Sequence, residues 1–271
     1  MAVVVIGRGI DLSIVPFMIV SVAILFVLVE GGWSVTSALL MAACAALALG
    51  IVNGVLIAYL DIPALFTTLA WGMVALGLGN YFVFDNFLVT MPDALGTVAW
   101  LGQGQLLGVP VSIYVFFALA IGVHMALAHT HAGRAVFAMG DNPQAARTAG
   151  LAIRPIIVIK YALVGLLAFI AGLIMATAVN EMNTRIGFST LPFDVILVVV
   201  IGGIGLSGGK GGIHNVVVGT LLIGVLSNGM AILNLGYTDQ KIIQALVLLG
   251  AIILDGILNP RDEQTSQQGD I

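Results

Sequence analysis

Runs of apolar residues dominate the chain, and glycine, proline, asparagine, aspartate and charged residues interrupt them. The runs have the length of a membrane-spanning helix, which needs about 20 mostly apolar residues. They lack the alternation of polar and apolar residues over about 10 positions that a membrane β-barrel strand shows. Eight spans are therefore predicted, the sixth being short and continuing into a glycine-rich segment that can bend or re-enter. They cover approximately residues 12–29, 35–60, 62–84, 109–128, 156–179, 191–206, 213–233 and 240–258.

The composition agrees with a membrane protein. Hydrophobic residues make up 60% of the 271 positions and charged residues only 8%, whereas soluble domains are about 45–50% apolar and about 25% charged. A water-soluble fold of this composition could not cover its apolar surface. The predicted fold class is an all-α, polytopic membrane helix bundle. One transmembrane domain is expected over residues 1–259, with a solvated tail at 260–271.

Basic residues predict the orientation of the spans, because lysine and arginine concentrate in cytoplasmic loops. If the polar loop at 129–155 is cytoplasmic, seven of the nine basic residues fall on that side, and only Arg185 and Lys241 fall outside. The tail at 260–271 is then cytoplasmic too. The seven residues are Arg8, Arg134, Arg147, Arg154, Lys160, Lys210 and Arg261.

The N-terminus and the single cysteine give two further expectations. Met1–Ile6 is too short for a span and has the pattern of the last turns of a helix whose beginning is missing. Cys44 lies inside an apolar run, so no intrachain disulfide can form and a packing role is expected. The net charge of −4 comes without a cluster of basic residues, so no nucleic-acid partner is predicted.

A glycine-rich segment follows the sixth predicted span and contains a formal G-x-G-x-x-G pattern at Gly203, Gly205 and Gly208. A dinucleotide-binding turn would need a soluble βαβ unit and an acidic residue about 20 positions further on, and neither is present. A phosphate-binding P-loop also fails, because Lys210 is followed by glycine instead of serine or threonine. Any ATPase must therefore be another chain. We expect these glycines to allow close helix approach and a tight turn.

The loop from Gly133 to Gly150 is the most informative polar segment. Asn142 is a good helix cap, Pro143 suits the first helical position, and Gly150 suits a left-handed stop. The loop therefore predicts a two-turn helix at roughly 143–149, outside the membrane. Such a helix is either ordinary loop structure or a segment that docks on a partner and transmits movement.

Several polar side chains lie within or near the predicted spans, including Asp11, Ser13, Thr68, Asn80 and Asp255. Such groups are costly in a membrane and often face a bundle interior or a cavity. They therefore indicate either a transport pathway, or solvation at the interface and interhelical hydrogen bonds. The candidate pathway residues are Asn53, Thr67, Trp71 and Asn228.

No pattern indicates catalysis, a metal site or a cofactor. His124, His129, His131 and His214 lack the spacing of metal ligands. The chain contains no H-E-x-x-H and no pair of carboxylates placed for acid–base work. We therefore predict no catalytic residue, no metal and no cofactor.

Three segments together resemble the permease family of bacterial ABC importers for ribose, xylose, galactose and similar monosaccharides. They are Gly9-Ile10-Asp11-Leu12-Ser13, the loop from Gly133 to Gly150, and the stretch from Asp194 through Gly202-Gly203 to Gly208-Gly209-Lys210-Gly211. Their order and separation also match, so the resemblance covers essentially the whole chain. The residues that carry it are Gly9, Asp11, Ser13, Asp194, Gly202, Gly203, Gly208, Gly209 and Lys210.

The resemblance implies a ten-helix permease in the bacterial cytoplasmic (inner) membrane. It implies three kinds of partner in addition to the lipid bilayer: a second permease copy or homologue, an extracytoplasmic solute-binding protein, and a cytoplasmic ATP-binding subunit. The loop would be the coupling segment seated in that ATPase. Its residues are Gly133, Arg134, Gly140, Asn142, Pro143, Ala145, Arg147 and Gly150.

The chain departs from the family pattern at its beginning. Arg8 and Pro16 flank the first motif, where family members commonly have neither a charge nor a proline. The first helix and most of the second are absent, so the start codon is called too late or the chain is naturally short. Two other functions stay open: a branched-chain amino-acid permease of the same superfamily, and an ion-coupled secondary transporter or channel. An intramembrane enzyme lacks a nucleophile with a base.

Overall fold

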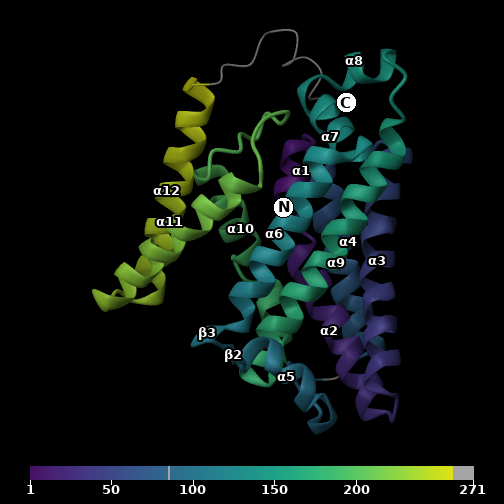
Figure 1. Ribbon diagram of the computed structural model, residues 1–271, viewed down its shortest axis with the longest axis vertical. Coiled ribbons are helices and arrows are strands. Elements are labelled where there is room, and N and C mark those ends of the chain that lie inside the picture. The colour runs from purple at the N-terminus through teal and green to yellow at the C-terminus, as the bar shows by residue number, and fades with distance from the viewer. Residues whose placement is uncertain (85, 259–271) are drawn as a thin grey trace. The chain divides into compact units, whose positions relative to one another are not determined.

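The computed structural model describes residues 1–84 and 86–258, and most of them are helical (Figure 1). Asp85 and the predicted tail, with Arg261, lie outside the described residues. The helices are α1 (Ala2–Ile6), α2 (Ile14–Glu30), α3 (Val35–Tyr59), α4 (Ala64–Phe82), α5 (Gly96–Gln103), α6 (Val111–His129), α7 (His131–Asp141), α8 (Pro143–Thr148), α9 (Ile153–Val179), α10 (Leu191–Ile201), α11 (Ile213–Ile232) and α12 (Tyr237–Leu258).

Six of these helices are long and apolar enough to cross a membrane, namely α3, α4, α6, α9, α11 and α12. The other two predicted spans are also helical, but α2 has 17 residues and α10 only 11. Judged by helix length and composition, six of the eight predicted spans are therefore supported. The prediction of 191–206 is too long because the chain leaves the helix at Gly202 and Gly203, and Gly203 has a φ of +92°.

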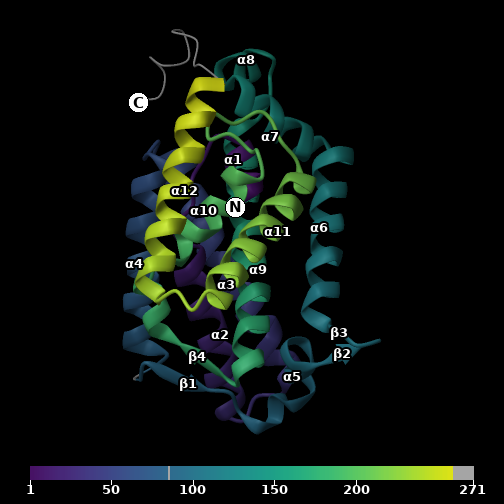
Figure 2. The same cartoon turned by 90° about the vertical axis from the view of Figure 1, so that its left-hand side faces the viewer.

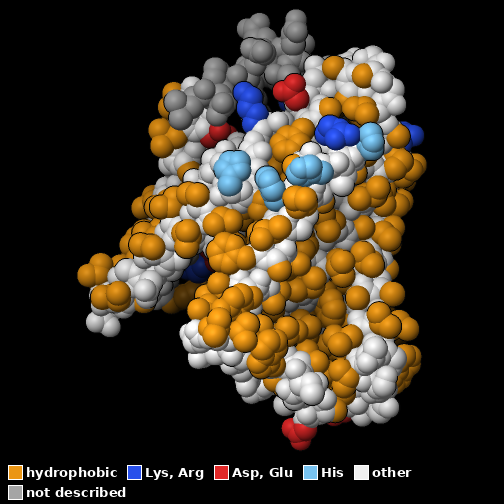
Figure 3. Space-filling view, in the orientation of Figure 1, with side chains coloured by type: hydrophobic (Ala, Val, Ile, Leu, Met, Phe, Trp, Pro, Cys, Tyr) orange, Lys and Arg blue, Asp and Glu red, His pale blue; other side chains and the backbone are white. Residues whose placement is uncertain are grey.

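The helices group into two compact units. Unit 1 contains residues 1–10, 120–153 and the chain from 193 onward, and unit 2 contains residues 11–119 and 154–192. Hydrophobic side chains are spread over the surface visible in Figure 3, and charged ones are few. A surface of this kind suits helices that face lipid.

Unit 2 is a bundle in which α2, α3, α4 and α9 run side by side (Figures 1 and 2). α2 is apolar on all sides, which is typical of a helix that other helices surround. Its side chains Phe17, Ile19, Leu25 and Phe26 are fully buried. The centre of the unit is therefore the helix that follows the Gly9–Ser13 motif.

Small residues line one face of α3 at every fourth position, and this face is buried. They are Ala38, Ala42, Ala46, Gly50, Gly54 and Ala58. Positions four apart share one face of a helix, and small residues there let two backbones approach closely. A Cβ atom on Gly54 would lie 2.6 Å from the Cα of Val158 in α9, and one on Gly165 of α9 would overlap the carbonyl oxygen of Ala46.

The opposite face of α3 carries large apolar side chains that are exposed in this chain. They include Leu40, Met41, Ile51, Val52 and Val55. Cys44 is exposed as well, so the packing role expected for it is not found within this chain. α3 thus presents one narrow face to its own unit and one bulky face to its surroundings.

Short strands and helices lie between the predicted spans at one end of unit 2. β1 (Leu88–Thr90) pairs antiparallel with β4 (Glu181–Asn183), and Val89 lies opposite Met182. β2 (Gln105–Leu106) pairs with β3 (Val109–Pro110), and two short 3-10 helices span Asp93–Leu95 and Thr184–Phe188. The Nε2 atom of Gln103 donates to the carbonyl oxygen of Thr177 at 2.8 Å, which fixes α5 to the end of α9.

Unit 1 contains α1, α7 and α8, and also α10, α11 and α12. A Cβ atom on Gly219 of α11 would overlap the carbonyl oxygen of Val198 in α10, and Asn215 Nδ2 donates to the Gly202 carbonyl oxygen at 2.6 Å. Gln244 Nε2 of α12 donates to Ser227 Oγ of α11 at 3.2 Å. Backbone approach and hydrogen bonds therefore hold these three helices together.

The contact between α3 and α9 can be tested with Gly54→Ala. The added methyl group would meet the backbone of α9, which cannot rotate away, so we expect a loss of about 1–3 kcal/mol of stability. Gly77→Ala on α4 is the matched control, because nothing lies within 4 Å of a Cβ atom there. Thermal unfolding of the purified protein in detergent measures both. Equal melting temperatures for the two variants would contradict the close contact.

Candidate functional site

A buried network of polar groups holds the non-helical segment that precedes α2. Oδ1 of Asp11 accepts hydrogen bonds from the backbone N of Ser13 at 2.8 Å and from its Oγ at 2.5 Å. Ser13 Oγ in turn accepts from Asn53 Nδ2 of α3 at 3.1 Å. Thr68 Oγ1 of α4 accepts from the backbone N of Leu12 at 3.1 Å. All four polar side chains are fully buried.

This network explains how an irregular backbone is tolerated beside apolar helices. Peptide groups outside a helix need partners when they lie at membrane depth, and the side chains of Asp11 and Thr68 accept hydrogen bonds from two of them. The structure thus joins the motif residues Asp11 and Ser13 to Asn53, which sequence reasoning had placed in a separate group of pathway candidates. Gly9 belongs to the same non-helical segment, but it is part of unit 1.

The remaining pathway candidates are arranged differently. Thr67 Oγ1 donates to the Pro63 carbonyl oxygen of its own helix start at 3.1 Å. Trp71 Nε1 donates to the carbonyl oxygen of Leu49 at 3.0 Å and so links α4 to α3. Asn228 belongs to unit 1 and is exposed on α11. Asn53 and Thr67 are therefore buried inside the bundle, and Asn228 is the candidate whose side chain is exposed.

A second constellation forms in unit 1, where the glycine-rich turn after α10 meets the ends of α1 and α7. The backbone N of Gly209 donates to the Ile6 carbonyl oxygen at 2.8 Å. A Cβ atom on Gly140 would overlap the same oxygen, and one on Gly208 would lie 3.1 Å from the Gly140 carbonyl oxygen. Two of the three segments that carry the resemblance, the loop and the glycine-rich stretch, therefore meet here together with the end of α1.

The turn itself requires glycine. The backbone φ angles are +78° at Gly208, +74° at Gly209 and +107° at Gly211, a region that other residues enter only at a cost. Lys210 is exposed on this turn. The glycines thus serve a tight turn and close packing, as the sequence predicted.

A short helix occupies the loop at the position expected from Asn142 and Gly150. The Oδ1 atom of Asn142 accepts from the backbone N atoms of Gln144 at 3.1 Å and Ala145 at 3.0 Å. Gly150 has a φ of +82° and follows the end of α8. Most side chains of α8 are exposed, including Ala145 and Arg147, and Ala146 is buried.

The preceding helix α7 was not predicted, although it contains Gly133, Arg134 and Gly140. Thr130 caps it, since its Oγ1 accepts from the backbone N of Gly133 at 3.0 Å. The buried apolar positions Ala135, Val136 and Met139 recur at helical spacing. This capping residue and this spacing are the sequence signals that could have revealed α7.

Asp194 of the third motif forms an ion pair with Lys241 of α12. Asp194 Oδ2 and Lys241 Nζ are 2.5 Å apart, and both side chains are about one quarter exposed. Lys241 is one of the two basic residues that do not follow the predicted cytoplasmic bias. Its ion pair with Asp194 offers a local electrostatic reason for its position. Lys160, which the bias assigned to the cytoplasmic side, has its side chain buried in unit 2.

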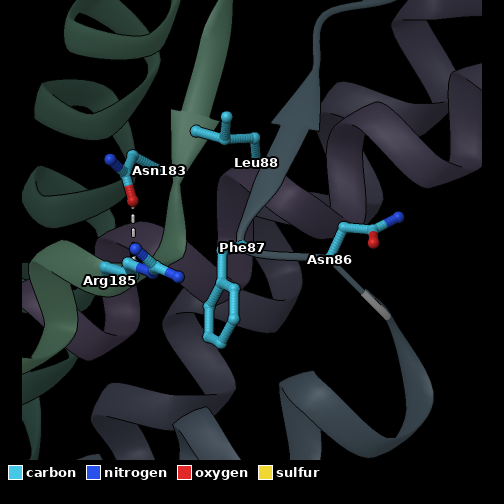
Figure 4. Close-up of a pocket in the computed structure, with 5 residues that line it drawn as sticks. All are labelled: Asn86, Phe87, Leu88, Asn183 and Arg185. Carbon is cyan, nitrogen blue, oxygen red and sulfur yellow. Dashed lines mark hydrogen bonds between the residues drawn. The ribbon is translucent and has the colours of Figure 1, made fainter.

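A pocket of about 460 Å³ lies beside β1 and β4 in unit 2 (Figure 4). The guanidinium carbon of Arg185 lies 4.3 Å from the centroid of the Phe87 ring, and Asn183 Oδ1 accepts from the Arg185 backbone N at 3.0 Å. Asn86 and Leu88 complete the lining. Sequence reasoning gave no role to this pocket.

Metal ligands do not gather anywhere in residues 1–84 and 86–258, where no three His, Cys, Asp or Glu side chains are placed to hold an ion. The polar groups described above are suited to positioning backbone and to contact with other chains. They do not form a nucleophile with an adjacent base.

Comparison with known proteins identifies the family. A family model described as the permease component of the branched-chain amino acid transport system matches residues 1–254. The ribose import permease protein RbsC of Escherichia coli K12 is 32% identical over 258 residues, which cover 94% of this chain and 79% of the relative. RbsC of Bacillus subtilis 168 is 31% identical over 255 residues, with the same two coverages.

A third relative is named for another sugar. The L-arabinose transport system permease protein AraH of E. coli K12 is 37% identical over 210 residues, which cover 75% of this chain and 61% of AraH. No solved structure matches the chain. The chain therefore belongs to the family of permease components of the branched-chain amino acid transport system, and it is a transport subunit and not an enzyme.

Proposed function

We propose that this chain is the permease subunit of an ATP-binding-cassette importer for a monosaccharide in the bacterial cytoplasmic membrane. The observation that carries the proposal is that relatives named for ribose and arabinose match 75–94% of the chain. The partners would be a cytoplasmic ATP-binding subunit, a second permease copy or homologue, and an extracytoplasmic solute-binding protein. The permease would alternate access by rigid shifts that the ATPase imposes.

α2 and α10 would lie in the bilayer with the six longer helices, giving eight membrane segments. Support for α2 comes from its burial between neighbours of span length, α3 and α4. Support for α10 comes from its apolar sequence and from the glycine-rich turn that follows it, because irregular backbone is tolerated at membrane depth against protein.

α8 would be the coupling helix that docks on the ATPase. Its side chains at Ala145 and Arg147 are exposed. It follows α7 directly, and the C-terminal end of α7 is braced at Gly140 by the Ile6 carbonyl and by Gly209. A displacement of α8 would therefore be transmitted to the glycine turn through direct backbone contacts, which no side-chain rearrangement can absorb.

Asn53 and Thr67 would hold helices together and would not contact the solute. Their burial and their hydrogen bonds favour this role over the pathway role. Asn228 would be the residue of the four that a solute can reach, since its side chain is exposed on α11.

Uptake measurements separate the candidate functions. Cells that express the chain with its ATPase and binding protein should accumulate labelled D-ribose or L-arabinose, and ATP depletion should abolish the uptake. The family model is described for branched-chain amino acids, so ATP-dependent uptake of leucine without sugar uptake would support that alternative. Uptake driven by an ion gradient without ATP would contradict an importer of this class.

Charge changes on α8 test the coupling role. Ala145→Glu and Arg147→Glu place negative charge on the exposed face, and we expect ATPase co-purification to fall at least about tenfold, since interface centres are depleted of such charge. The yield of folded permease should stay constant. Thr36→Glu, at an exposed position in the first turn of α3, is the control and should retain the ATPase. Full co-purification of both α8 variants would refute the assignment.

Alanine substitutions in the glycine turn test whether it transmits movement. Gly209→Ala combines a φ of +74° with a Cβ atom only 2.8 Å from the backbone of Asp141. Gly32→Ala has a similar φ of +85° but open space around it, so it isolates the backbone strain of about 1–2 kcal/mol. Gly209→Ala should reduce uptake at least about tenfold per folded molecule, and Gly32→Ala about twofold at most. Equal losses would show that packing at the turn is irrelevant.

A further inference from the structure

Arg185 carries a positive charge at the end of unit 2 where β1 and β4 pair. It lies in the short 3-10 helix Thr184–Phe188 and is exposed. Within residues 1–84 and 86–258, its guanidinium forms no ion pair and donates no hydrogen bond, whereas Lys241 is paired with Asp194. A guanidinium has five N–H donors and keeps its charge in proteins. Arg185 is therefore equipped to bind an anionic group that these residues do not supply.

Contacts around Arg185 fix the shape of the pocket beside β1 and β4. The guanidinium carbon lies 4.3 Å from the centroid of the Phe87 ring (Figure 4), and an arginine held against a ring keeps the N–H groups at its edge available. The Thr184 backbone N donates to the Phe87 carbonyl oxygen at 2.8 Å, and Asn183 Oδ1 accepts from the Arg185 backbone N at 3.0 Å. The backbone on both sides of the guanidinium is therefore fixed before a partner binds.

The pocket lies beyond the membrane-crossing part of unit 2. β1 and β4 form a two-stranded sheet whose outer edges are open, and such edges do not occur in contact with lipid hydrocarbon. The sheet strand β4 follows α9, whose 27 residues span about 40 Å and so exceed the hydrocarbon core of about 30 Å. The other end of α9 begins at Ile153, after the loop that the basic residues predict to be cytoplasmic. On that orientation the pocket faces the extracytoplasmic side.

The side chains at the pocket favour a protein as the partner. Phe87 and Leu88 line the pocket and are exposed, and Phe188 at the end of the same short helix is 75% exposed. Arginine and aromatic residues are enriched in protein interfaces and among the residues that contribute most to binding. A small free anion would leave these apolar side chains in water, whereas a protein surface would cover them. A carboxylate on that surface matches Arg185, because two parallel N–H···O bonds can join the two groups.

We propose that Arg185 and the pocket beside β1 and β4 dock a carboxylate side chain of the extracytoplasmic solute-binding protein. The carboxylate accepts hydrogen bonds from the edge of the guanidinium, and apolar side chains of the binding protein cover Phe87 and Leu88. Asn86 and Asn183 supply amide groups in the same lining. This inference rests on the proposed function, because it needs a binding protein as the partner.

Binding measurements on two arginine positions test the assignment. The full chain is assembled with its ATPase in phosphatidylcholine nanodiscs, and the binding protein that supports uptake is titrated against it. Arg185→Gln should weaken binding at least about tenfold, and Arg185→Lys should weaken it less, because it keeps the charge without the planar fork. Arg154→Gln is the matched control, since Arg154 is also exposed and lies 5.5 Å from the Tyr59 ring at the other end of α9. It should keep the affinity within about twofold.

The Arg185→Lys variant also identifies the group that docks. A water-soluble carbodiimide activates a carboxylate, and the introduced amine then displaces the activating group to form an amide bond. Mass spectrometry should find this bond to an Asp or Glu of the binding protein in the Arg185→Lys complex and not in the Arg154→Lys complex. A bond confined to carboxylates of the permease itself, such as Asp85, would mean that Arg185 pairs within its own chain, and the proposal would be wrong.

A lipid phosphate is the competing source of negative charge. Native mass spectrometry of the purified protein counts bound phosphatidylglycerol, and we expect the same count for the wild type and for Arg185→Gln. If Arg185→Gln releases this lipid and binds the solute-binding protein as tightly as the wild type does, Arg185 recognises a lipid headgroup and the docking role is refuted.

Uptake of D-ribose or L-arabinose separates this inference from the proposed function. With limiting binding protein, Arg185→Gln should lower the uptake rate at least about fivefold, and an excess of binding protein should restore it, because only docking is weakened. Wild-type uptake with unchanged docking in Arg185→Gln would contradict this inference alone. A wild type that neither binds the protein nor transports either sugar would contradict both.

Discussion

Between α3 and α9 the two backbones come so close that only glycine or alanine fits on the facing side of α3. Gly50, Gly54 and Ala46 meet the backbone of α9 without side chains between them. This approach fixes the position of Asn53, and Asn53 fixes Ser13 at the start of α2. Since α2 is the buried centre of unit 2, its placement depends on a face of α3 that carries almost no side-chain volume.

Unit 1 also contains close backbone contacts, at glycine positions around one turn. The turn at Gly208–Gly211 reaches Ile6 and α7 through backbone atoms, and Gly140 offers no side chain in between. Backbone contacts of this kind are stiff, because no rotamer can change to absorb a displacement. A short exposed helix attached to such a support is suited to transmit movement, which is why we propose that α8 and the glycine turn act together.

The positions of the helices could be predicted because apolar runs end where Gly, Pro and polar residues begin, as at Gly31 and Pro63. α8 could be predicted because Asn142, Pro143 and Gly150 each satisfy a local backbone requirement. The buried faces could not, because a helix that is apolar on all sides shows no periodicity that distinguishes lipid from protein. For the same reason the sequence did not reveal that Lys160, within the predicted span 156–179, is buried.

The order of the helices along the chain has a consequence for biosynthesis. Val158 of α9 follows Gly54 of α3, whose Cβ position it meets, by about 100 residues, which at about 5–20 residues per second is an interval of roughly 5–20 s. The contacts of α3 with α9 can therefore form only after α2, α3 and α4 have all been synthesised.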